Sequence, residues 1–390
     1  MSDAWTLRDG RKWREIMMGN SSVSVLVDTE TQKNKLRPKH SVAIVIVTYG
    51  DRSHLLAEVI RGIKAQTVGE LIKNIIVYNN GANEKTLAFL KEIAKDDKRF
   101  QIVVSSDNKG SAAGYAAAIN EAVKINAEYI WCLDDDNRPN PDALEQLLYV
   151  IELMQESGPV ALLSLRDDRQ CIKRANGASI SEAFGRPYSA LGFSVKDIPR
   201  KILDRLSNKA TKENDINMKI LQDPVLVPYA PYGGFFFKAD FIARVGLPRE
   251  DFYLYGDDHE FTARFTANNI PIYLVPTSRV HDVERSWHVD RTYVSRWGSN
   301  RLLRDGETEK IPRLFYTIRN RIFFEANCMN WRKKPQYYIN LFTYLILLFL
   351  QAIYLRLKGE RLPWQSYKVI LEAVKAGFYA DLGRVSDFLK

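Results

Sequence analysis

The sequence predicts an α/β protein built on a mostly parallel β-sheet with helices on its faces. Short apolar and β-branched runs alternate with helical patterns between residues 41 and 165. The first run, Ser41 to Tyr49, is almost continuously β-branched, as is typical of a parallel strand buried on both faces. Polar residues gather where the runs end. Open α/β sheets bind ligands beyond the carboxyl ends of their strands, so this pattern also indicates a site.

Each element follows from its local pattern. Strands are expected at 41–49, 75–78, 101–104, 127–132 and 160–165, with helices at 53–66, 84–95, 111–125 and 141–154. Strands that alternate with helices form right-handed crossovers and therefore a parallel sheet. Ser53 follows the turn after the first strand and is predicted to cap the first helix.

Three consecutive carboxylates, Asp134, Asp135 and Asp136, follow the fourth strand. Like charges this close repel and raise one another's pKa, and a divalent cation removes that cost. Carboxylate oxygens suit Mg²⁺ or Mn²⁺. The competing interpretation is a solvated acidic turn that caps the helix beginning near Pro141. Spacing alone leaves both interpretations open.

The turn from Asn108 to Gly114 follows the third strand. Its glycines would let the backbone approach a ligand, and the helix N-terminus beyond them attracts anions. It lacks the first glycine of the dinucleotide fingerprint and follows the third strand, so that motif does not apply. A tight strand-to-helix turn is the competing explanation.

Two further segments suggest sugar chemistry. Gly233 and Gly234 precede an aromatic strand; such a pair is often only a flexible joint, but it can also form a floor beneath a sugar ring. Asp257 and Asp258 follow an aromatic segment and begin a helix that extends to about Asn268. One of them could cap that helix, yet two adjacent acids there also suit a general base for an acceptor hydroxyl.

His281 follows a strand-like segment and could complete a metal site as a neutral imidazole. A lone histidine in such a place is more often structural. His288, seven residues later, is an equal competitor by spacing.

In order, these segments resemble family 2 glycosyltransferases, which are inverting nucleotide-sugar enzymes with the GT-A fold. The resemblance covers roughly residues 41–285 and rests on Val45–Tyr49, Asn108–Gly110 with Gly114, Leu133–Asp136 with Pro139 and Pro141–Asp142, Gly233–Phe236, and Asp257–Glu260. Within the family, the chain is most similar to bacterial galactofuranosyltransferases and rhamnosyltransferases of cell-surface polysaccharide assembly.

The resemblance implies a role for each matching residue. The nucleotide-sugar would contact Thr48, Tyr49, Asp51, Arg52, Asn80, Asp107, Asn108, Gly110, Asp135, Gly233 and Gly234. Asp134, Asp136 and His281 would bind Mn²⁺ or Mg²⁺. Asp258 would be the catalytic base, and Asp257 would stand where the family more usually has glutamate.

The implied reaction is a direct displacement in which Asp258 deprotonates the attacking acceptor hydroxyl. The metal would stabilise the departing diphosphate. Rhamnosyltransferases often carry Asp-Gln-Asp at the metal position. This chain has aspartate in the middle position as well, which favours UDP-galactofuranose over dTDP-rhamnose as the donor. A lipid-linked glycan is the expected acceptor.

Residues 286–390 are expected to be helical and to associate with a membrane. Pro335 to Leu355 carries no charge, and residues 331–390 hold a net +6 of the chain's +9. About 20 apolar residues can cross a bilayer, but polar residues interrupt this run. We therefore expect a helix lying on the inner leaflet, attracted by anionic lipids. A helix buried in a homo-oligomer interface is the alternative.

The segment Leu314–Arg321 resembles an aromatic-plus-Arg-Asn segment common in the same two subgroups. Spacing does not reveal its chemistry. Arg319 could meet a phosphate or pair with an acid between domains, and we expect the structural role.

The remaining features suit a cytoplasmic enzyme. Three widely spaced cysteines predict no disulfide framework, the N-terminus lacks a signal-peptide layout, and a 46% apolar content can fill a large core. The role of residues 1–40 stays open between an added strand, an oligomer contact and an arm.

Two other classes of protein fit the sequence less well than a transferase. A nucleotidyltransferase would want a glycine- and lysine-rich loop after the first strand, where Thr48–Arg52 has one glycine. A non-catalytic sugar-binding subunit would not need both a metal-type cluster and a separate base. The basic charge lies beside an apolar segment without a nucleic-acid motif, so a membrane is a better partner than nucleic acid.

Overall fold

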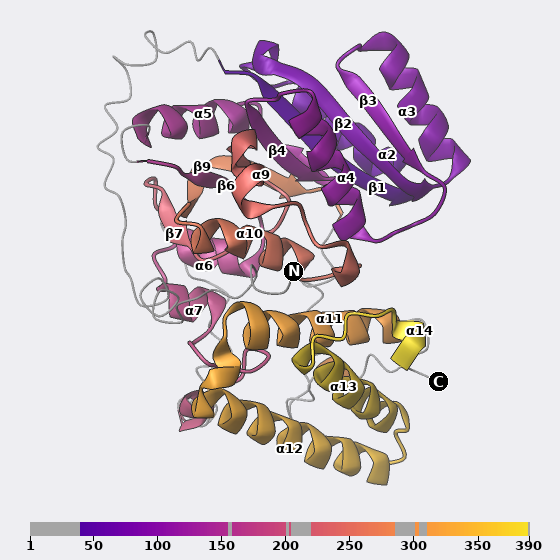
Figure 1. Ribbon diagram of the computed structural model, residues 1–390, viewed down its shortest axis with the longest axis vertical. Helices are drawn as coiled ribbons and strands as arrows, with labels where there is room; N and C mark the ends of the chain where they lie inside the picture. The colour runs from indigo at the N-terminus through magenta and orange to yellow at the C-terminus, as the bar shows by residue number, and fades with distance from the viewer. Residues whose placement is uncertain are drawn as a thin grey trace.

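The computed structural model describes residues 40–154, 158–199, 203, 220–284, 301–303 and 310–388. Residues 1–39, the predicted boundary at 285/286 and His288 lie outside the described residues. Figure 1 shows an upper body built around a sheet and a lower body of helices.

The sheet is mixed and curled. Across the described ranges its strands run in the order β3-β2-β1-β4-β8-β6-β9-β5, with β7 pairing with β9. They are β1 (Val42–Gly50), β2 (Ile72–Ala82), β3 (Phe100–Ser105), β4 (Tyr129–Asp134), β5 (Asn137–Pro139), β6 (Ala161–Leu165), β7 (Val225–Val227), β8 (Phe235–Lys238) and β9 (Ile272–Asp282). β3, β2, β1 and β4 are parallel, and β8 runs antiparallel between β4 and β6. The α/β class predicted from the sequence is therefore confirmed, with all five expected strands present. The sheet is less parallel than expected: among the described strands, four pairings are parallel and four are antiparallel.

The β-branched first strand builds a core on each face of the sheet. Val42, Ile44 and Ile46 belong to the core that α2 (Ser53–Lys64), α3 (Glu84–Asp96) and α5 (Ala143–Met154) cover. Ala43, Val45 and Val47 belong to the core that includes α4 (Ser111–Lys124) and α10 (Asp257–Ala267). Successive strand side chains point to opposite faces, so a continuous apolar run is what this central strand requires.

The remaining helices of the upper body are short: α6 (Arg169–Ala175), α7 (Ile180–Phe184) and α9 (Ile242–Val245). The capping predictions were wrong. Arg52 occupies the N-cap of α2 without a side-chain cap bond, because β1 continues to Gly50 and the guanidinium reaches into the site. The N-cap of α10 is Gly256 in the left-handed conformation, and Asp257 is its first helical residue.

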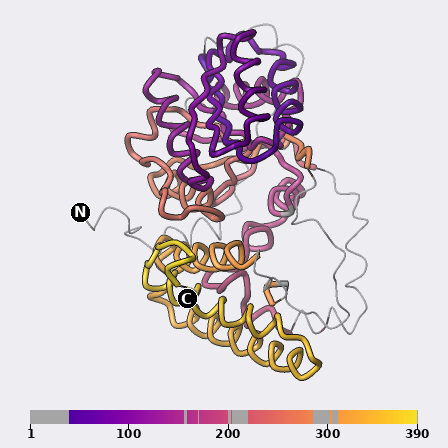
Figure 2. Tube along the Cα trace, turned by 90° about the vertical axis from the view of Figure 1, so that its right-hand side faces the viewer, coloured from indigo at the N-terminus to yellow at the C-terminus, as the bar shows by residue number. Residues whose placement is uncertain are grey.

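The lower body consists of α11 (Ile311–Phe323), α12 (Pro335–Leu357), α13 (Leu362–Phe378) and α14 (Val385–Phe388), as Figures 1 and 2 show. A π-helical turn, Phe324–Cys328, continues α11. The segment around Tyr188 joins the two bodies, since the buried Asn340 donates to the Tyr188 carbonyl at 2.7 Å and accepts from the Val195 amide at 2.9 Å.

The predicted apolar helix is present as α12. It is long and apolar enough to cross a membrane by length and composition. One side packs on the protein through Tyr337, Leu341, Leu348, Ala352 and Leu355. The other side exposes apolar residues at helical spacing: Tyr338, Ile339, Phe342, Ile346, Leu347, Phe349, Leu350, Tyr354 and Leu357. How this helix relates to a membrane stays a prediction.

Candidate active site

The carboxyl ends of β1 and β4 lie side by side, and their polar residues meet there. Val47 pairs with Asp134 in the sheet register, which puts Thr48 next to Asp135. The Thr48 hydroxyl donates to Asp135 Oδ2 at 2.7 Å, and Arg52 Nε lies 2.9 Å from each oxygen of the same carboxylate. Asp135 is only 5% exposed, and the partners of its carboxylate in the structure are Thr48 and Arg52. Its predicted contact with the nucleotide-sugar stays a prediction.

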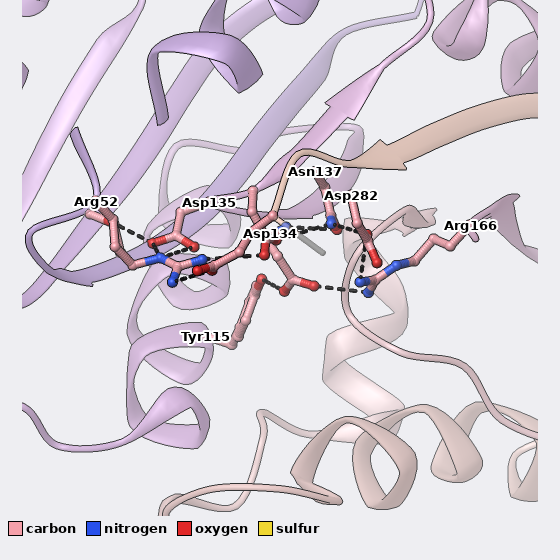
Figure 3. Close-up of polar contacts among 10 residues, drawn as sticks. Arg52, Tyr115, Asp134, Asp135, Asn137, Arg166 and Asp282 are labelled. Atoms are coloured by element: carbon pink, nitrogen blue, oxygen red, sulfur yellow. Dashed lines mark hydrogen bonds and ion pairs between the residues drawn. The ribbon is translucent and has the colours of Figure 1, made fainter. Parts of the chain in front are cut away.

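A second arginine holds the neighbouring carboxylates (Figure 3). Arg166 bridges Asp134 and Asp282 through its two terminal nitrogens, each at 2.9 Å. Asn137 donates to Asp282 at 2.8 Å and to Asp136 at 3.2 Å. We call Asp134, Asp135, Asp136 and Asp282 the acidic rim.

The acidic rim carries more negative charge than its arginines offset. Burial, outweighing the attraction of Arg52, raises the pKa of Asp135 to about 6. Burial and the charges of Asp134 and Asp135 raise the pKa of Asp136 to about 7. Burial also raises the pKa of Asp282. A solvated helix-capping turn would not be buried in this way, so the structure favours a site for additional positive charge.

The oxygen donors of the acidic rim suit a divalent cation, but the predicted ligand set is not assembled. His281 Nδ1 lies 3.4 Å from Asp167 Oδ2, and the imidazole is partly exposed. In the described part of the chain, no group of three or more His, Cys, Asp or Glu side chains is placed to hold a metal ion. The assignment of Asp134, Asp136 and His281 as ligands stays a prediction, with Asp282 as an additional carboxylate.

Asn80 shapes the turn after β3. Its side-chain amide donates to Asn108 Oδ1 at 3.1 Å and to the Gly110 carbonyl at 3.0 Å, and it accepts from the Lys109 amide at 2.8 Å. Gly110 has φ +88°, and a Cβ there would overlap the Tyr253 carbonyl. The turn therefore needs glycine at this position, and Asn80 fixes its conformation.

Four of the residues predicted to contact the nucleotide-sugar are exposed at the same edge, whereas the others are buried (Thr48, Asn80, Gly110, Asp135, Gly233 and Gly234) or partly buried (Arg52). Tyr49 is 49% exposed and lies beneath the Arg52 guanidinium, 5.3 Å from ring centroid to Cζ. Asp51, Asp107 and Asn108 are exposed. These side chains are free to contact a ligand that arrives over the carboxyl ends of β1 and β2.

The glycine pair lies against the acidic rim. A Cβ on Gly233 would be 2.7 Å from Asp134 Oδ2, and Gly234 has φ +91°. The sequence predicted a floor beneath a sugar ring here, which stays a prediction. In the structure the atoms nearest to a Cβ on Gly233 are Asn137 Oδ1, Arg166 Nη1 and Asp134 Oδ2.

Two stacked tyrosines connect the acidic rim with the two aspartates that begin α10. Tyr115 donates to Asp134 Oδ1 at 2.7 Å and stacks on Tyr232 at 3.8 Å between ring centroids. Tyr232 also lies 6.0 Å from Phe261 of α10 between ring centroids, so this ring packs against the helix that the two aspartates begin. Asp257 is buried and accepts from the Ser111 hydroxyl at 3.0 Å, whereas Asp258 is partly exposed. The partly exposed Asp258 is thus the member that can reach a substrate.

Burial and the adjacent Asp258 raise the pKa of Asp257 to about 8, from an ordinary value of about 4. Between these values the native state holds a proton that the unfolded chain has lost, so this group's contribution to stability falls as the pH rises through that window. Asp257→Asn removes this dependence. We expect the melting temperature of the variant, relative to wild type, to increase between about pH 5 and about pH 8.5. A difference that stays constant with pH, measured by thermal unfolding in matched buffers, would contradict the assignment.

Sequence reasoning missed Tyr115, Asn137, Arg166 and Asp282. Arg166 directly follows β6, and Asp282 is the last residue of β9, so the rule that placed Asp134 at a strand end could have found both. Tyr115 gave no such signal, because an aromatic residue within a helix pattern indicates core.

The described fold and site define a class: an α/β domain that gathers carboxylates and exposed polar side chains at the carboxyl ends of parallel strands. Within that class, residues 43–186 match the family model of glycosyl transferase family 2. This match supports a glycosyltransferase domain in this part of the chain, and the mixed sheet with flanking helices agrees with the predicted GT-A-like fold.

A search of solved structures found, among others, GalNAc-T7 with UDP, GalNAc and Mn²⁺. It is 14% identical with a TM-score of 0.46, over 76% of this chain and 52% of that one. The chain therefore spans about half the length of that protein. No curated protein sequence matches the chain.

Proposed function

We propose that the protein is an inverting glycosyltransferase that moves galactofuranose from UDP-galactofuranose onto a hydroxyl of a lipid-linked glycan, in cell-surface polysaccharide synthesis. The observation that carries the proposal is the acidic rim in a family 2 domain, joined by the Tyr115–Tyr232 stack to the aspartates that begin α10. The third aspartate at the metal position favours the galactofuranose donor over dTDP-rhamnose.

The acidic rim provides the oxygen donors for a divalent cation. Asp134 and Asp136 would hold Mn²⁺ or Mg²⁺, with Asp282 beside them and His281 as the predicted further ligand. When bound, such a cation acts as a Lewis acid that stabilises the charge on the departing diphosphate.

The chain's own residues account for the other requirements. Asp258 accepts the proton of the acceptor hydroxyl, whose oxygen forms a bond to the anomeric carbon. The bond from that carbon to the diphosphate oxygen breaks on the opposite face, so the configuration inverts. Tyr49, Asp51 and Asp107 line the exposed edge for the nucleoside. Arg52 and Arg166 hold the rim carboxylates in place.

The test is nucleotide release from a panel of UDP- and dTDP-sugars with Mn²⁺, with and without a lipid-linked acceptor mimic. We expect acceptor-dependent UDP release from UDP-galactofuranose, lost in Asp136→Ala. Release of dTDP from dTDP-rhamnose would reassign the donor. Absence of turnover and of nucleotide binding would remove the transferase proposal.

We further propose that the protein lies on the inner leaflet through α12. The exposed apolar side runs the whole length of this helix while its other side packs on the protein, which suits a helix lying in the plane of the interface. Arg332, Lys333 and Lys334 precede the helix, Arg356 lies in its last turn and Lys358 directly follows it, so basic side chains at both ends can meet anionic lipid headgroups.

Replacing Phe342 and Leu350 together by Glu should abolish co-sedimentation with vesicles containing anionic lipid, because two charges would enter the apolar face. Phe342 is 68% and Leu350 56% exposed, so the fold should survive. Val104→Glu is the matched control: it is equally exposed at 56% but lies on β3, and it should bind vesicles like wild type. Unchanged vesicle binding together with a shift from dimer to monomer in light scattering would instead support the homo-oligomer interface.

A further inference from the structure

The aromatic-plus-Arg-Asn segment of the sequence lies in α11, at the top of the lower body (Figure 1). Arg319 and Asn320 are both completely buried. Their side chains bond to the loop from Asp251 to Gly256 in the upper body. This loop leads directly into the aspartates of α10. The sequence analysis expected a structural role for Arg319 but did not predict that it and Asn320 contact this loop.

The side-chain amide of Asn320 lies within hydrogen-bonding distance of three backbone carbonyls of that loop. Its side-chain amide nitrogen lies 3.0 Å from the Phe252 carbonyl oxygen, 2.8 Å from that of Leu254 and 2.7 Å from that of Tyr255. An amide NH₂ has two N–H donors, so one of them is shared between two of these carbonyls, and all three contacts require the nitrogen of the Asn320 amide to face the loop.

Arg319 sets the orientation of Asn320. Its Nε donates to Asn320 Oδ1 at 2.8 Å, which leaves the amide nitrogen to face the loop. Its Nη2 donates to the Phe252 carbonyl at 2.9 Å and to that of Asp251 at 3.2 Å, and its Nη1 donates to the Gly383 carbonyl. A fully buried guanidinium that binds backbone carbonyls is costly and suggests a specific task.

The loop needs such support because its backbone is strained. Tyr253 and Tyr255 both have φ +64°, and Gly256 has φ +75°. Non-glycine residues rarely adopt this region unless their surroundings impose it, and such strain often marks functional sites.

The same loop connects both halves of the proposed site. The Tyr253 carbonyl accepts from the Ala112 amide at 3.4 Å and lies against Gly110, in the turn after β3 that is predicted to contact the nucleotide. Gly256, at its other end, is the N-cap from which Asp257 and Asp258 follow. A shift of the loop would therefore move the base relative to the donor.

We propose that Asn320, oriented by Arg319, is a positioning residue that fixes Asp258 against the donor, and that the lower body thereby forms part of the catalytic apparatus. This inference rests on the proposed transferase function. It predicts that loss of the Asn320 side chain lowers the rate of the chemical step more than it weakens donor binding. Asn320 bonds directly to the loop that leads into Asp258, whereas it reaches the turn at Gly110 only through Tyr253 and does not touch the acidic rim.

The test compares Asn320→Ala with Asn340→Ala, using a soluble acceptor mimic. Asn340 is the matched control: it is equally buried on α12 and also bonds two backbone groups, but its partners are Tyr188 and Val195, away from the rim. Asn320→Ala should lower kcat by about 10- to 100-fold with the donor KM within about twofold of wild type. Asn340→Ala should destabilise the fold and leave kcat near wild type.

Hydrogen exchange gives a readout that does not depend on turnover. The amides of Phe252, Tyr253 and Leu254 should exchange faster in Asn320→Ala and as in wild type in Asn340→Ala. Asn320→Asp replaces the alanine variant if that variant does not fold. Aspartate has the same size as asparagine but presents an oxygen in place of the donor nitrogen. This variant should also show the lower kcat and the faster exchange of the loop amides.

Unchanged kcat or unchanged loop exchange in the Asn320 variants overturns the inference, as does an equal fall of kcat in Asn340→Ala. A wild type that turns over no donor instead removes the proposed function. Loop exchange then still decides whether Asn320 holds the segment.

Discussion

Asp258→Asn is expected to lower turnover by about 1,000-fold while nucleotide binding persists. The amide cannot take the proton of an acceptor hydroxyl, and a positioned general base contributes about 10² to 10⁴ in rate. A loss of about 1,000-fold corresponds to about 4 kcal/mol of transition-state stabilisation. Steady-state rates with saturating donor and acceptor, together with calorimetric titration of the nucleotide, measure both quantities.

Glu260→Gln is the control for this variant. Glu260 lies two positions further along α10, is buried and pairs with Arg264 at 3.2 Å, so the substitution removes the same charge from the same helix turn without touching the pair at its start. It should keep kcat within a few-fold of wild type. A loss in Glu260→Gln as large as that in Asp258→Asn would show that charge at the helix N-terminus, and not proton transfer, explains the effect.

The sequence predicted most of what is local. The apolar runs at 41–49 and 127–132 predicted two parallel strands, and parallel strands bring their carboxyl ends to one edge of the sheet. Thr48 and Asp135 were therefore expected at the same edge; the strand order makes them neighbours, with their side chains 2.7 Å apart. The helix from Asp257 and the strand from Ile272 were also found at the predicted places.

What the sequence did not predict depends on strand order. β8 inserts antiparallel between β4 and β6, and β9 follows β6, so Arg166 and Asp282 arrive beside Asp134 from distant parts of the chain. The capping errors have a similar cause. Arg52 is drawn to Asp135 and Asp136, and the left-handed Gly256 is set by the loop that Asn320 holds, so tertiary contacts override the local preference for a side-chain cap.

Gly233→Ala is expected to lower turnover by at least about 100-fold, although the change adds only one methyl group. A Cβ at this position would lie 2.7 Å from Asp134 Oδ2 and 2.5 Å from Arg166 Nη1, and it would overlap Asn137 Oδ1. Arg166 donates to the Asp134 carboxylate, and the Asp134 backbone amide donates to Asn137 Oδ1. Arg166 and Asn137 also both donate to Asp282, so one of these groups cannot move without the others. A displacement of about 1 Å at a catalytic site can cost about 10² in rate. The backbone itself accepts alanine, since Gly233 does not have a positive φ.

The measurement separates two explanations of this glycine. If it is only a floor beneath the sugar ring, Gly233→Ala raises the donor KM and leaves the Mn²⁺ dependence unchanged. If it makes room for the acidic rim, kcat falls and the Mn²⁺ concentration for half-maximal rate rises, because Asp134 is displaced. Gly69→Ala is the control, with open space around its Cβ and no positive φ, and it should match wild type. The contact distances favour a fall in kcat with a weaker response to Mn²⁺. The nearest neighbours of the added methyl group are the carboxylate of Asp134 in the acidic rim and the two side chains that bond to the rim, Arg166 and Asn137.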